Sequence, residues 1–495
     1  METIGADDIL LFCVLFTLFF SSFKLYKKKS QLPPGPVPWF FLGNLLKKDM
    51  LPLSKYYSKF TEKYGPIFTV WLGPKPLVVL CGYEVVKDAL VHHAEEFGGR
   101  PFIPVHDKLA KGQGFLGSKD ETKWRELRRF TLTTLRDFGM GKNSMSERIR
   151  EESLSLLKEI AATQGKPFDP QGSILTANAN VMSSLIYGEY FDYKDEWFQE
   201  HINTLRSRFD FFRSFPAILY NSLPQIMDYF PGFHQMMLAD SEKLCASIRE
   251  KIAVSRQNLD PQNPNGFIES FLVRSEEETN TVKDFYSDGD LVMSVFALFL
   301  AAAAVTSDAL LFSLVLMAKH PHIQAKVQEE IDEAVGTMRL PCSEDRKRMP
   351  FTNAVVHECQ RYQIFNPEIL SRKVTCHIKF RGYSIPKGTT VLPLLTSVHY
   401  DPLQWETPEK FNPNHFLDEK GHFRRRDAFM PFSAGKRSCL GESLARMELF
   451  LFFSILLQKF TFQMAGEAKN MDPFSLFLAY KRRKHPQMEA IRRSV

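Results

Sequence analysis

The chain has few cysteines for its length and no pairing pattern among them. Its 495 residues include seven cysteines, an odd number, and none stands in a Cys-x-x-Cys pair. Scattered cysteines argue against a disulfide framework and a zinc site, and they fit a reducing compartment. The sequence also lacks a Walker loop, a Gly-x-Ser-x-Gly turn and a His-Glu-x-x-His helix, so no motif indicates nucleotide hydrolysis, serine hydrolysis or zinc proteolysis.

The chain also has little excess of positive over negative charge. The net charge is +6, which is too mild to indicate nucleic-acid binding, and no nucleic-acid motif accompanies it. The segment Gly112–Gly117 satisfies the pattern Gly-x-Gly-x-x-Gly. A dinucleotide loop follows an apolar strand, whereas the residues before this segment are charged and irregular, so we interpret the match as accidental.

Strand-like alternation is sparse, and helical spacing of apolar residues dominates the body of the chain. Together with 44% hydrophobic residues, this predicts a large, mainly α fold with small β-sheets. The expected helices are 146–160, 240–256, 291–319, 322–335 and 441–457, and the expected strands are 67–72, 77–80, 378–380 and 390–392.

The N-terminus reads as a separate unit. Residues Ile9 to Phe23 are almost wholly apolar, acidic residues precede them, and Lys27–Lys29 follow. This charge order and the lack of a small-residue cleavage site favour an uncleaved anchor over a cleaved signal peptide, with the body in the cytoplasm. The proline-rich segment Pro33–Pro36 stops any helix and predicts a stiff hinge. We expect an anchor over 1–26, a hinge over 27–38 and one catalytic body over 39–495.

The most informative segment is Phe432–Gly441. It places Cys439 beside basic residues and between Gly435, which permits a tight turn, and Gly441, which allows close approach by a flat partner. A helix is expected directly afterwards, and cations and a helix N-terminus lower the pKa of a thiol. We therefore expect a thiolate that faces a flat space, an arrangement that suggests axial ligation of haem iron.

The pattern Phe-x-x-Gly-x-Arg-x-Cys-x-Gly over Phe432–Gly441 resembles the haem-ligand loop of the cytochrome P450 family without a mismatch. The resemblance covers nearly the whole chain and is strongest to the vertebrate microsomal members, which oxidise drugs, fatty acids and steroids. It implies a cytochrome P450 fold preceded by one N-terminal transmembrane helix. It also implies haem b bound through Cys439 and a place in the endoplasmic reticulum membrane, with the N-terminus luminal.

The resemblance assigns further haem contacts. Trp124 and Arg128 lie four residues apart and match the family's clamp on a haem propionate; this spacing puts an indole N–H and a guanidinium on one helix face. Arg372 and Arg437 match other positions that contact the propionates. Phe432 matches the aromatic residue that shields the proximal sulfur.

A second motif has a structural role in the family. Glu358 and Arg361 lie three residues apart, on one face of an expected helix. They match the family's Glu-x-x-Arg pair, which ties this helix to a meander ahead of the haem loop. The corresponding meander here is 408–416, with His415 in the place of the third partner. Loss of one member of a buried ionic cluster leaves an uncompensated charge, so we expect structural damage from such a change.

The central helix departs from the family at the position that matters most for catalysis. The family usually carries an acid followed by a threonine, which together deliver the protons that dioxygen cleavage requires. This chain has Ala304 and Val305 instead, and neither side chain donates or relays a proton. Thr306 follows one residue later, about 100° around the helix. Either a local π-bulge re-aims Thr306, or water or a substrate hydroxyl supplies the protons.

The substrate pocket is predicted only from family position. The expected lining is entirely apolar, which indicates a hydrophobic ligand, and no charged anchor for a carboxylate stands out. The aromatic segments 209–216 and 229–233 match the family's lid over the substrate channel, which often touches the membrane; core packing is the alternative. The expected lining residues are Phe115, Phe296, Leu300, Ala301, Ile369 and Leu476.

Basic residues near the haem loop predict a positive face for an acidic electron donor. By resemblance this donor is an NADPH-dependent flavoprotein reductase, with cytochrome b5 as a possible helper. The basic residues are Arg129, Arg136, Lys142 and Lys436.

Three functions stay open from the sequence. The first is NADPH-dependent monooxygenation of a hydrophobic small molecule such as a xenobiotic, a fatty acid or a steroid. The second is rearrangement of a peroxide, which needs no protonation of dioxygen. The third is a haem-binding protein of weak activity. The last two follow from the replacement of the acid–alcohol pair by Ala304 and Val305.

Overall fold

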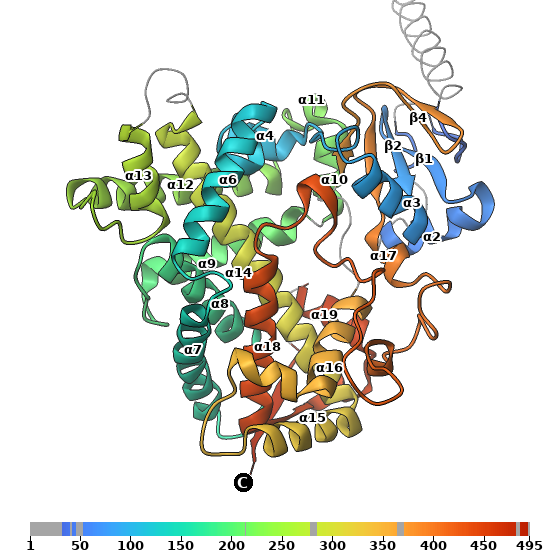
Figure 1. Cartoon of the computed structure of the whole chain (residues 1–495). Coiled ribbons are helices and arrows are strands. Elements are labelled where there is room, and N and C mark those ends of the chain that lie inside the picture. The colour runs from blue at the N-terminus through green and yellow to red at the C-terminus, as the bar shows by residue number, and fades with distance from the viewer. Residues whose placement is uncertain are drawn as a thin grey trace, which may run out of the picture.

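The computed structural model describes residues 32–39, 42–45, 53–212, 214–277, 285–363, 371–481 and 486–493. Helices make up most of it (Figure 1). The helices are α2 (Leu53–Tyr64), α3 (Tyr83–Lys87), α4 (Pro104–Ala110), α5 (Gly114–Gly117), α6 (Glu121–Asp137), α7 (Asn143–Ala162), α8 (Gln171–Ile186), α9 (Glu196–Phe212), α10 (Phe215–Ser222), α11 (Pro224–Met227), α12 (Phe233–Gln257), α13 (Phe267–Glu277), α14 (Asp288–Lys319), α15 (Pro321–Ala334), α16 (Pro350–Tyr362), α17 (Leu395–His399), α18 (Glu442–Lys459) and α19 (Pro473–Lys481).

Three small sheets complete the fold. The largest has the strand order β1-β2-β6-β3 and lies beside α2 and α3, at the upper right of Figure 1. Strand β2 pairs antiparallel with β1 and parallel with β6, which a long helical crossover separates from it in sequence. The strands are β1 (Ile67–Leu72), β2 (Lys75–Leu80), β3 (Arg372–Lys373), β4 (Ile378–Phe380), β5 (Tyr383–Ile385), β6 (Thr390–Pro393), β7 (Phe460–Met464) and β8 (Met488–Arg492).

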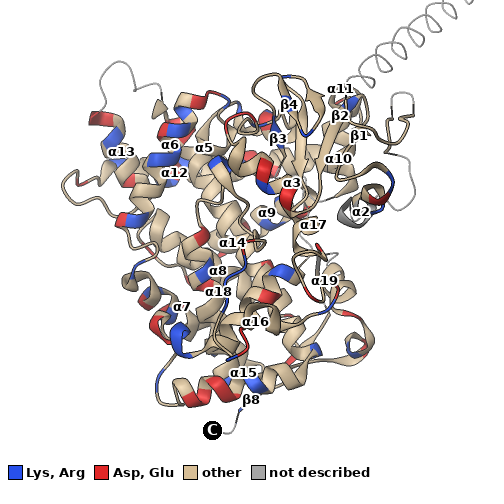
Figure 2. Ribbon diagram, turned by 45° about the vertical axis from the view of Figure 1, so that its right-hand side comes forward, with Lys and Arg blue, Asp and Glu red and all other residues tan. Residues whose placement is uncertain are grey.

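Helix α14 is the axis of the helical part. It begins where the Ser287 hydroxyl accepts a hydrogen bond from the Asp290 N–H, and it packs against α8, α9, α16 and α18. A helix that is apolar on all sides must be covered by neighbours or lipid. Here protein buries 78% of its most apolar window, although α14 is the one described helix long and apolar enough to cross a membrane. Figure 2 shows charged residues on the outer helices and little charge along α14.

The expected elements are confirmed. The five predicted helices correspond to α7, α12, α14, α15 and α18, and the four predicted strands to β1, β2, β4 and β6. The segment Gly112–Gly117 follows helix α4 and not a strand, so its interpretation as an accidental match is also confirmed.

Part of the segment that was predicted to be a hinge contacts strand β1. The carbonyl of Pro34 accepts a hydrogen bond of 2.8 Å from the Thr69 N–H. A Cβ at Gly35 would lie 1.9 Å from the carbonyl oxygen of Thr69, so this close approach requires glycine. The anchor expected over 1–26 lies outside the described residues.

Candidate functional site: a haem-thiolate pocket

The loop Phe432–Gly441 leads into α18 and has a fixed shape. Gly435 has φ +70°, and a Cβ there would lie 1.7 Å from the carbonyl oxygen of Leu90. Leu90 belongs to a π-helical turn, Asp88–His92. The Cys439 N–H donates to the Phe432 carbonyl at 2.9 Å. Glycine at position 435 therefore seats the cysteine loop on a segment far away in sequence.

The sulfur of Cys439 faces accessible space. A Cβ at Gly441 would meet no atom within 4 Å, so the backbone leaves room for a flat partner. The Gly441 N–H is a hydrogen-bond donor to the sulfur, and both it and the charge of Arg128 favour the thiolate. Desolvation is the larger effect, however, and it raises the pKa of the Cys439 thiol. In the protein without a ligand, burial thus outweighs the basic neighbours that were expected to lower this pKa, and a bound cation such as haem iron would favour the thiolate.

Aromatic and basic side chains meet beside this loop. Trp124 and Arg128 lie on one face of α6, and the guanidinium carbon of Arg437 lies 3.3 Å from the Trp124 ring centroid. Arg128 Nη2 donates to the Ser438 carbonyl at 2.6 Å. Arg437 Nε donates to the Gly98 carbonyl at 2.9 Å. Trp124, Arg128 and Arg437 are thus brought together next to the cysteine.

Two more guanidinium groups join the cluster, and their charges repel one another. Arg372 is 1% exposed and donates to the Ser433 hydroxyl at 3.2 Å. Burial, and then repulsion by Arg100, Arg437 and Arg128, holds the pKa of Arg372 well below its usual value. The pKa values of Arg100 and Arg437 fall to about 10 and about 9, again chiefly through burial. So many buried cations fit a dianionic group, and haem carries two propionates.

Arg100 is a member of this cluster that sequence reasoning missed. It stands in an irregular segment, where it donates to the Ser371 carbonyl at 3.2 Å. No local motif marks it; only its proximity in space to Arg128, Arg372 and Arg437 does so. Phe432, the expected shield of the sulfur, lies 5.0 Å from the Arg446 guanidinium and accepts the Cys439 N–H at its carbonyl.

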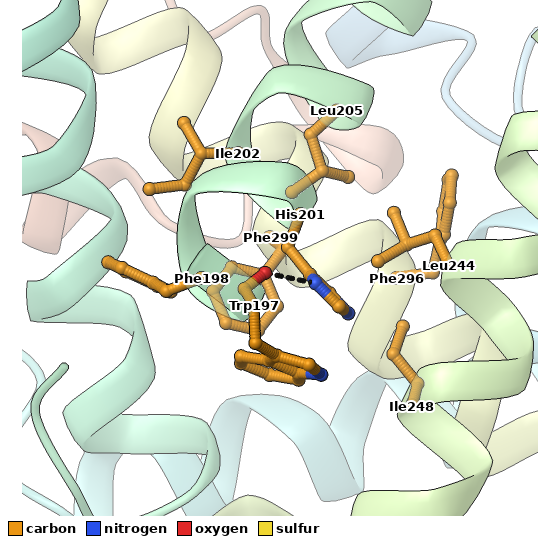
Figure 3. Close-up of a pocket in the computed structure, with 9 residues that line it drawn as sticks. All are labelled: Trp197, Phe198, His201, Ile202, Leu205, Leu244, Ile248, Phe296 and Phe299. Atoms are coloured by element: carbon orange, nitrogen blue, oxygen red, sulfur yellow. Dashed lines mark hydrogen bonds between the residues drawn. The ribbon is translucent and has the colours of Figure 1, made fainter. Parts of the chain in front are cut away.

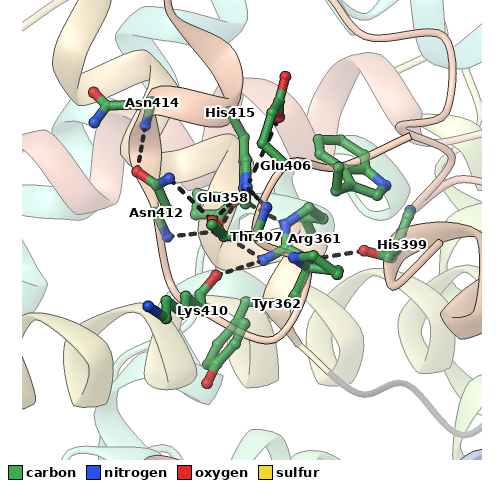
Figure 4. Close-up of polar contacts among 12 residues, drawn as sticks. Glu358, Arg361, Tyr362, His399, Glu406, Thr407, Lys410, Asn412, Asn414 and His415 are labelled. Carbon is green, nitrogen blue, oxygen red and sulfur yellow. Dashed lines mark hydrogen bonds and ion pairs between the residues drawn. The ribbon is translucent and has the colours of Figure 1, made fainter. Parts of the chain in front are cut away.

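The Glu358 and Arg361 side chains form a closed ionic cluster on α16 (Figure 4). Both are 0% exposed, and two hydrogen bonds of 2.7 Å join them. Arg361 also donates to three backbone carbonyls of the following segments, those of His399 at 2.7 Å, Pro408 at 2.8 Å and Lys410 at 2.9 Å. One side chain therefore ties α16 to the meander 408–416.

His415 completes the cluster in a defined tautomer. The Thr407 N–H donates to Nε2 of His415 at 3.2 Å, so Nε2 is an acceptor and Nδ1 carries the proton. Nδ1 lies 3.2 Å from both carboxylate oxygens of Glu358. The Asn412 N–H adds a further hydrogen bond of 2.8 Å to Glu358. The structure thus brings together the three residues that the sequence grouped.

The central helix keeps its departure from the family pattern. It is regular α-helix through Ala304, Val305 and Thr306, so no π-bulge re-aims Thr306. The Thr306 hydroxyl instead hydrogen bonds to Glu448 of α18, a fully buried carboxyl whose pKa burial raises well above its usual value. The interpretation of Thr306 as a displaced proton donor is therefore wrong, because its hydroxyl faces another helix.

A cavity of about 300 Å³ lies beside α14. Phe296, Leu300 and Ala301 line it as expected, together with Val305. Phe115 and Leu476 do not. Phe115 turns into the main core from the short helix α5, whereas its neighbour Leu116 faces the cavity, and Leu476 is 0% exposed within α19. Ile369 lies outside the described residues.

The cavity is flanked by a charge that sequence reasoning missed. Arg208 of α9 is 1% exposed, and its guanidinium carbon lies 4.9 Å and 5.0 Å from the rings of Phe296 and Phe212, which both line the cavity. Nη1 donates to the Ser241 hydroxyl at 2.7 Å, while Nε and Nη2 have no hydrogen-bond partner within the described part of the chain. Burial lowers the pKa of Arg208 to about 10. Only its packing against α12 and α14, not its local sequence, distinguishes it from a solvated arginine.

A second cavity lies on the other side of Phe296, between α9, α12 and α14 (Figure 3). Trp197 and His201 face it, and the Trp197 carbonyl lies 2.6 Å from Nδ1 of His201. Its volume of about 10 Å³ is sufficient for about one water molecule. A substrate therefore has room in the larger cavity but not in this one.

The two aromatic segments divide between core and surface. Phe209 and Phe211 are 8% and 1% exposed, whereas Tyr229, Phe230 and Phe233 are 87%, 58% and 47% exposed. The first segment therefore packs inward through Phe209 and Phe211 while Phe215 is exposed, and the second presents aromatic rings to the surface.

The basic residues expected to form a positive face are not equivalent. Arg136 and Lys142 are exposed, and Arg129 is 70% exposed beside Glu126. Lys436 is 14% exposed and pairs with Glu95 and Glu121, each at 2.5 Å. Its charge is thus engaged within the molecule, and it adds little to a positive surface.

Comparisons with known proteins identify the family of the chain. The chain matches the cytochrome P450 family over residues 33–487. It is 46% identical to cytochrome P450 2C5 of Oryctolagus cuniculus, over 92% of this chain and 93% of that protein. It is 44% identical to cytochrome P450 2C20 of Macaca fascicularis, over 94% and 95%, and 42% identical to cytochrome P450 2B19 of Mus musculus, over 92% and 93%. The chain belongs to the cytochrome P450 family, with relatives in family 2, and is a haem-containing monooxygenase of hydrophobic substrates.

Proposed function

We propose that Cys439 is the axial ligand of haem b and that Arg100, Arg128, Arg372 and Arg437 hold its propionates. The observation that carries this proposal is the convergence of four buried or half-buried guanidinium groups on the loop that presents the accessible sulfur. Haem, when bound there, supplies the chemistry that inserts one atom of dioxygen into a substrate. Trp124 packs under Arg437 and fixes the orientation of that guanidinium.

In this proposal the cavity of about 300 Å³ holds the substrate. Phe296, Leu300 and Ala301 of α14 give it an apolar wall, which excludes water and orients a hydrophobic molecule. In this proposal the Glu358–Arg361–His415 cluster contacts neither the haem nor the substrate. It holds the meander ahead of the cysteine loop, and so it acts through the position of that loop.

Membrane and electron-donor contacts belong to the same proposal. Residues 1–26 would anchor the chain to the endoplasmic reticulum membrane by a single span with a luminal N-terminus. The exposed rings of Tyr229, Phe230 and Phe233 suit a membrane interface. Arg129, Arg136 and Lys142 would receive an NADPH-dependent reductase, or cytochrome b5, by charge complementarity.

The proposal is tested with purified full-length protein. NADPH, dioxygen and reductase should give product from an apolar substrate, and added hydroperoxide should give product without reductase. Product from hydroperoxide, with none from NADPH, dioxygen and reductase, would contradict the NADPH-driven reaction and favour peroxide rearrangement. No product from either, with haem bound, would favour a haem-binding protein of weak activity.

The position of Arg208 narrows the substrate class further. A buried guanidinium with two nitrogens that bond to none of the described residues is costly unless an anion approaches it. We therefore propose that the preferred substrates, among xenobiotics, fatty acids and steroids, carry one carboxylate on an apolar body. The phenyl rings of Phe212 and Phe296 would have to move aside for that carboxylate to reach Arg208.

Replacement Arg208→Leu should discriminate between charged and neutral substrates. For a long-chain carboxylic acid we expect kcat/KM to fall by about tenfold or more, the loss of one charge-assisted hydrogen bond. For the methyl ester of the same acid we expect little change. The comparison of the two kcat/KM ratios is the measurement; an equal effect on acid and ester would contradict the role of Arg208 as an anchor.

A further inference from the structure

A polar cavity lies directly beside the position of the missing acid. Its volume is about 10 Å³, sufficient for about one water molecule. Ala304 lines it, and so does Asp308, one helical turn further along α14 and on the same face. The lining is completed by Gln171, Leu175, Arg206, Phe209, Asp210, Ser307 and Leu311. Polar side chains of α8, α9 and α14 thus line part of the space that a longer side chain at position 304 would enter.

The polar groups are suited to hold a water molecule. Gln171 of α8 is 6% exposed, and its Nε2 has no hydrogen-bond partner among the residues that the structure describes. An amide N–H buried without a partner is costly, and an ordered water usually satisfies it. Asp308 is 7% exposed, and the Ser307 hydroxyl already donates to the Ile174 carbonyl at 3.3 Å, which leaves its oxygen as an acceptor.

This cavity borders both the substrate cavity and the molecular surface. Phe209 lines both cavities, and Val305, the neighbour of Ala304, lines the larger one. On the outer side, the Asp210 side chain is 22% exposed, with Arg206 Nε at 3.7 Å. A proton entering from solvent at Asp210 would therefore reach Asp308 through the water site.

We propose that Asp308 and a water in this cavity replace the family's acid–alcohol pair as the proton source. Monooxygenation consumes dioxygen, two electrons from the reductase and two protons, and it yields hydroxylated substrate and water. In each transfer the Asp308 carboxyl gives a proton to the cavity water, which passes one of its own toward the haem side of α14. Asp308 regains its proton from solvent by way of Asp210. The inference rests on the proposed haem site.

Variant Asp308→Asn tests the relay, because an amide occupies the same space but does not act as the acid. We expect product formed per NADPH to fall by about 100-fold, the lower end of what acid–base groups contribute, with a matching rise in peroxide release. Product from added hydroperoxide should be retained, since that oxidant needs no protonation of dioxygen. Adding Ala304→Glu should restore coupling. Variant Ser313→Ala serves as the matched control. It removes a buried hydroxyl of α14 that donates to the Ala309 carbonyl.

A spectroscopic measurement checks the same inference without turnover. The infrared stretch of carbon monoxide on the reduced haem responds to hydrogen-bond donors on the substrate side. We expect it to differ between H₂O and D₂O in the natural protein and to lose that difference in Asp308→Asn. Unchanged coupling and an unchanged stretch in Asp308→Asn overturn the inference while leaving the haem site intact. Absence of the carbon monoxide complex in the natural protein overturns both.

If Asp308→Asn does not fold, Gln171→Leu tests the water site instead. This change removes the unpartnered amide and should lower coupling in the same direction, with the carbon monoxide band retained. Coupling equal to that of the natural protein would overturn the inference.

Discussion

Replacement of Cys439 by serine should abolish the thiolate-type Soret band of the reduced carbon monoxide complex. The proposed ligand is the one sulfur on the loop Phe432–Gly441, and a serine hydroxyl is neither as soft nor as acidic as a thiol. NADPH-driven product formation should fall below detection. The measurement is the reduced-minus-oxidised difference spectrum under carbon monoxide. A band at its original position and height would refute the ligand assignment and with it the haem site.

A second cysteine provides the control for this experiment. Cys359 is 1% exposed on α16, and burial raises its thiol pKa. Serine at 359 removes a thiol of the same chain without touching the loop at 439. We expect the carbon monoxide band to keep its position in Cys359→Ser, so a changed band there would show that the spectrum is not specific to the proposed ligand.

Replacement Arg361→Met should destabilise the fold by about 3–5 kcal/mol, because it leaves the carboxylate of Glu358 buried without its cation. Three backbone carbonyls that Arg361 serves would lose their donor as well. Arg361→Lys should recover only part of the loss, since an ammonium lacks the planar fork. Denaturant unfolding, followed by fluorescence at fixed haem occupancy, gives the free-energy difference.

The matched control for Arg361 is an exposed pair with the same spacing. Arg129 and Glu126 lie three residues apart on α6, with 2.7 Å between Nη2 of Arg129 and Oε2 of Glu126, and the Arg129 side chain is 70% exposed. Arg129→Met should change the free energy of unfolding by about 1 kcal/mol or less. An equally small effect at Arg361 would contradict a structural role for the buried cluster.

The fold could be predicted where its elements are long and periodic. The apolar spacing around 291–319 predicted α14 to within a turn, and alternation over 67–72 predicted β1 without error. Helices such as α5 and α11 have four residues each, too few for a period to register. Whether these short helices form depends on how the neighbouring segments pack, and a local sequence pattern carries no information about that packing.

In the candidate site, sequence reasoning found the residues that share one motif and missed those that only tertiary packing brings to the site. Cys439, Arg437 and Phe432 share one continuous motif, so sequence reasoning grouped them. Arg208 and Asp308 escaped it, because a charged residue on a helix is ordinarily solvated and only tertiary packing buries these two. Local reasoning also weighed the cations near the thiol at 439 but not its burial, which raises the pKa of that thiol in the protein without a ligand.

The seat of the ligand loop has a consequence for biosynthesis. Gly435 rests on the turn at Leu90, and Lys436 pairs with Glu95, 341 residues earlier in the chain. At about 5–20 residues per second, a ribosome needs roughly 20–70 s to synthesise the intervening segment. The pocket cannot close until translation is nearly complete, so the nascent polypeptide cannot capture its prosthetic group before that point.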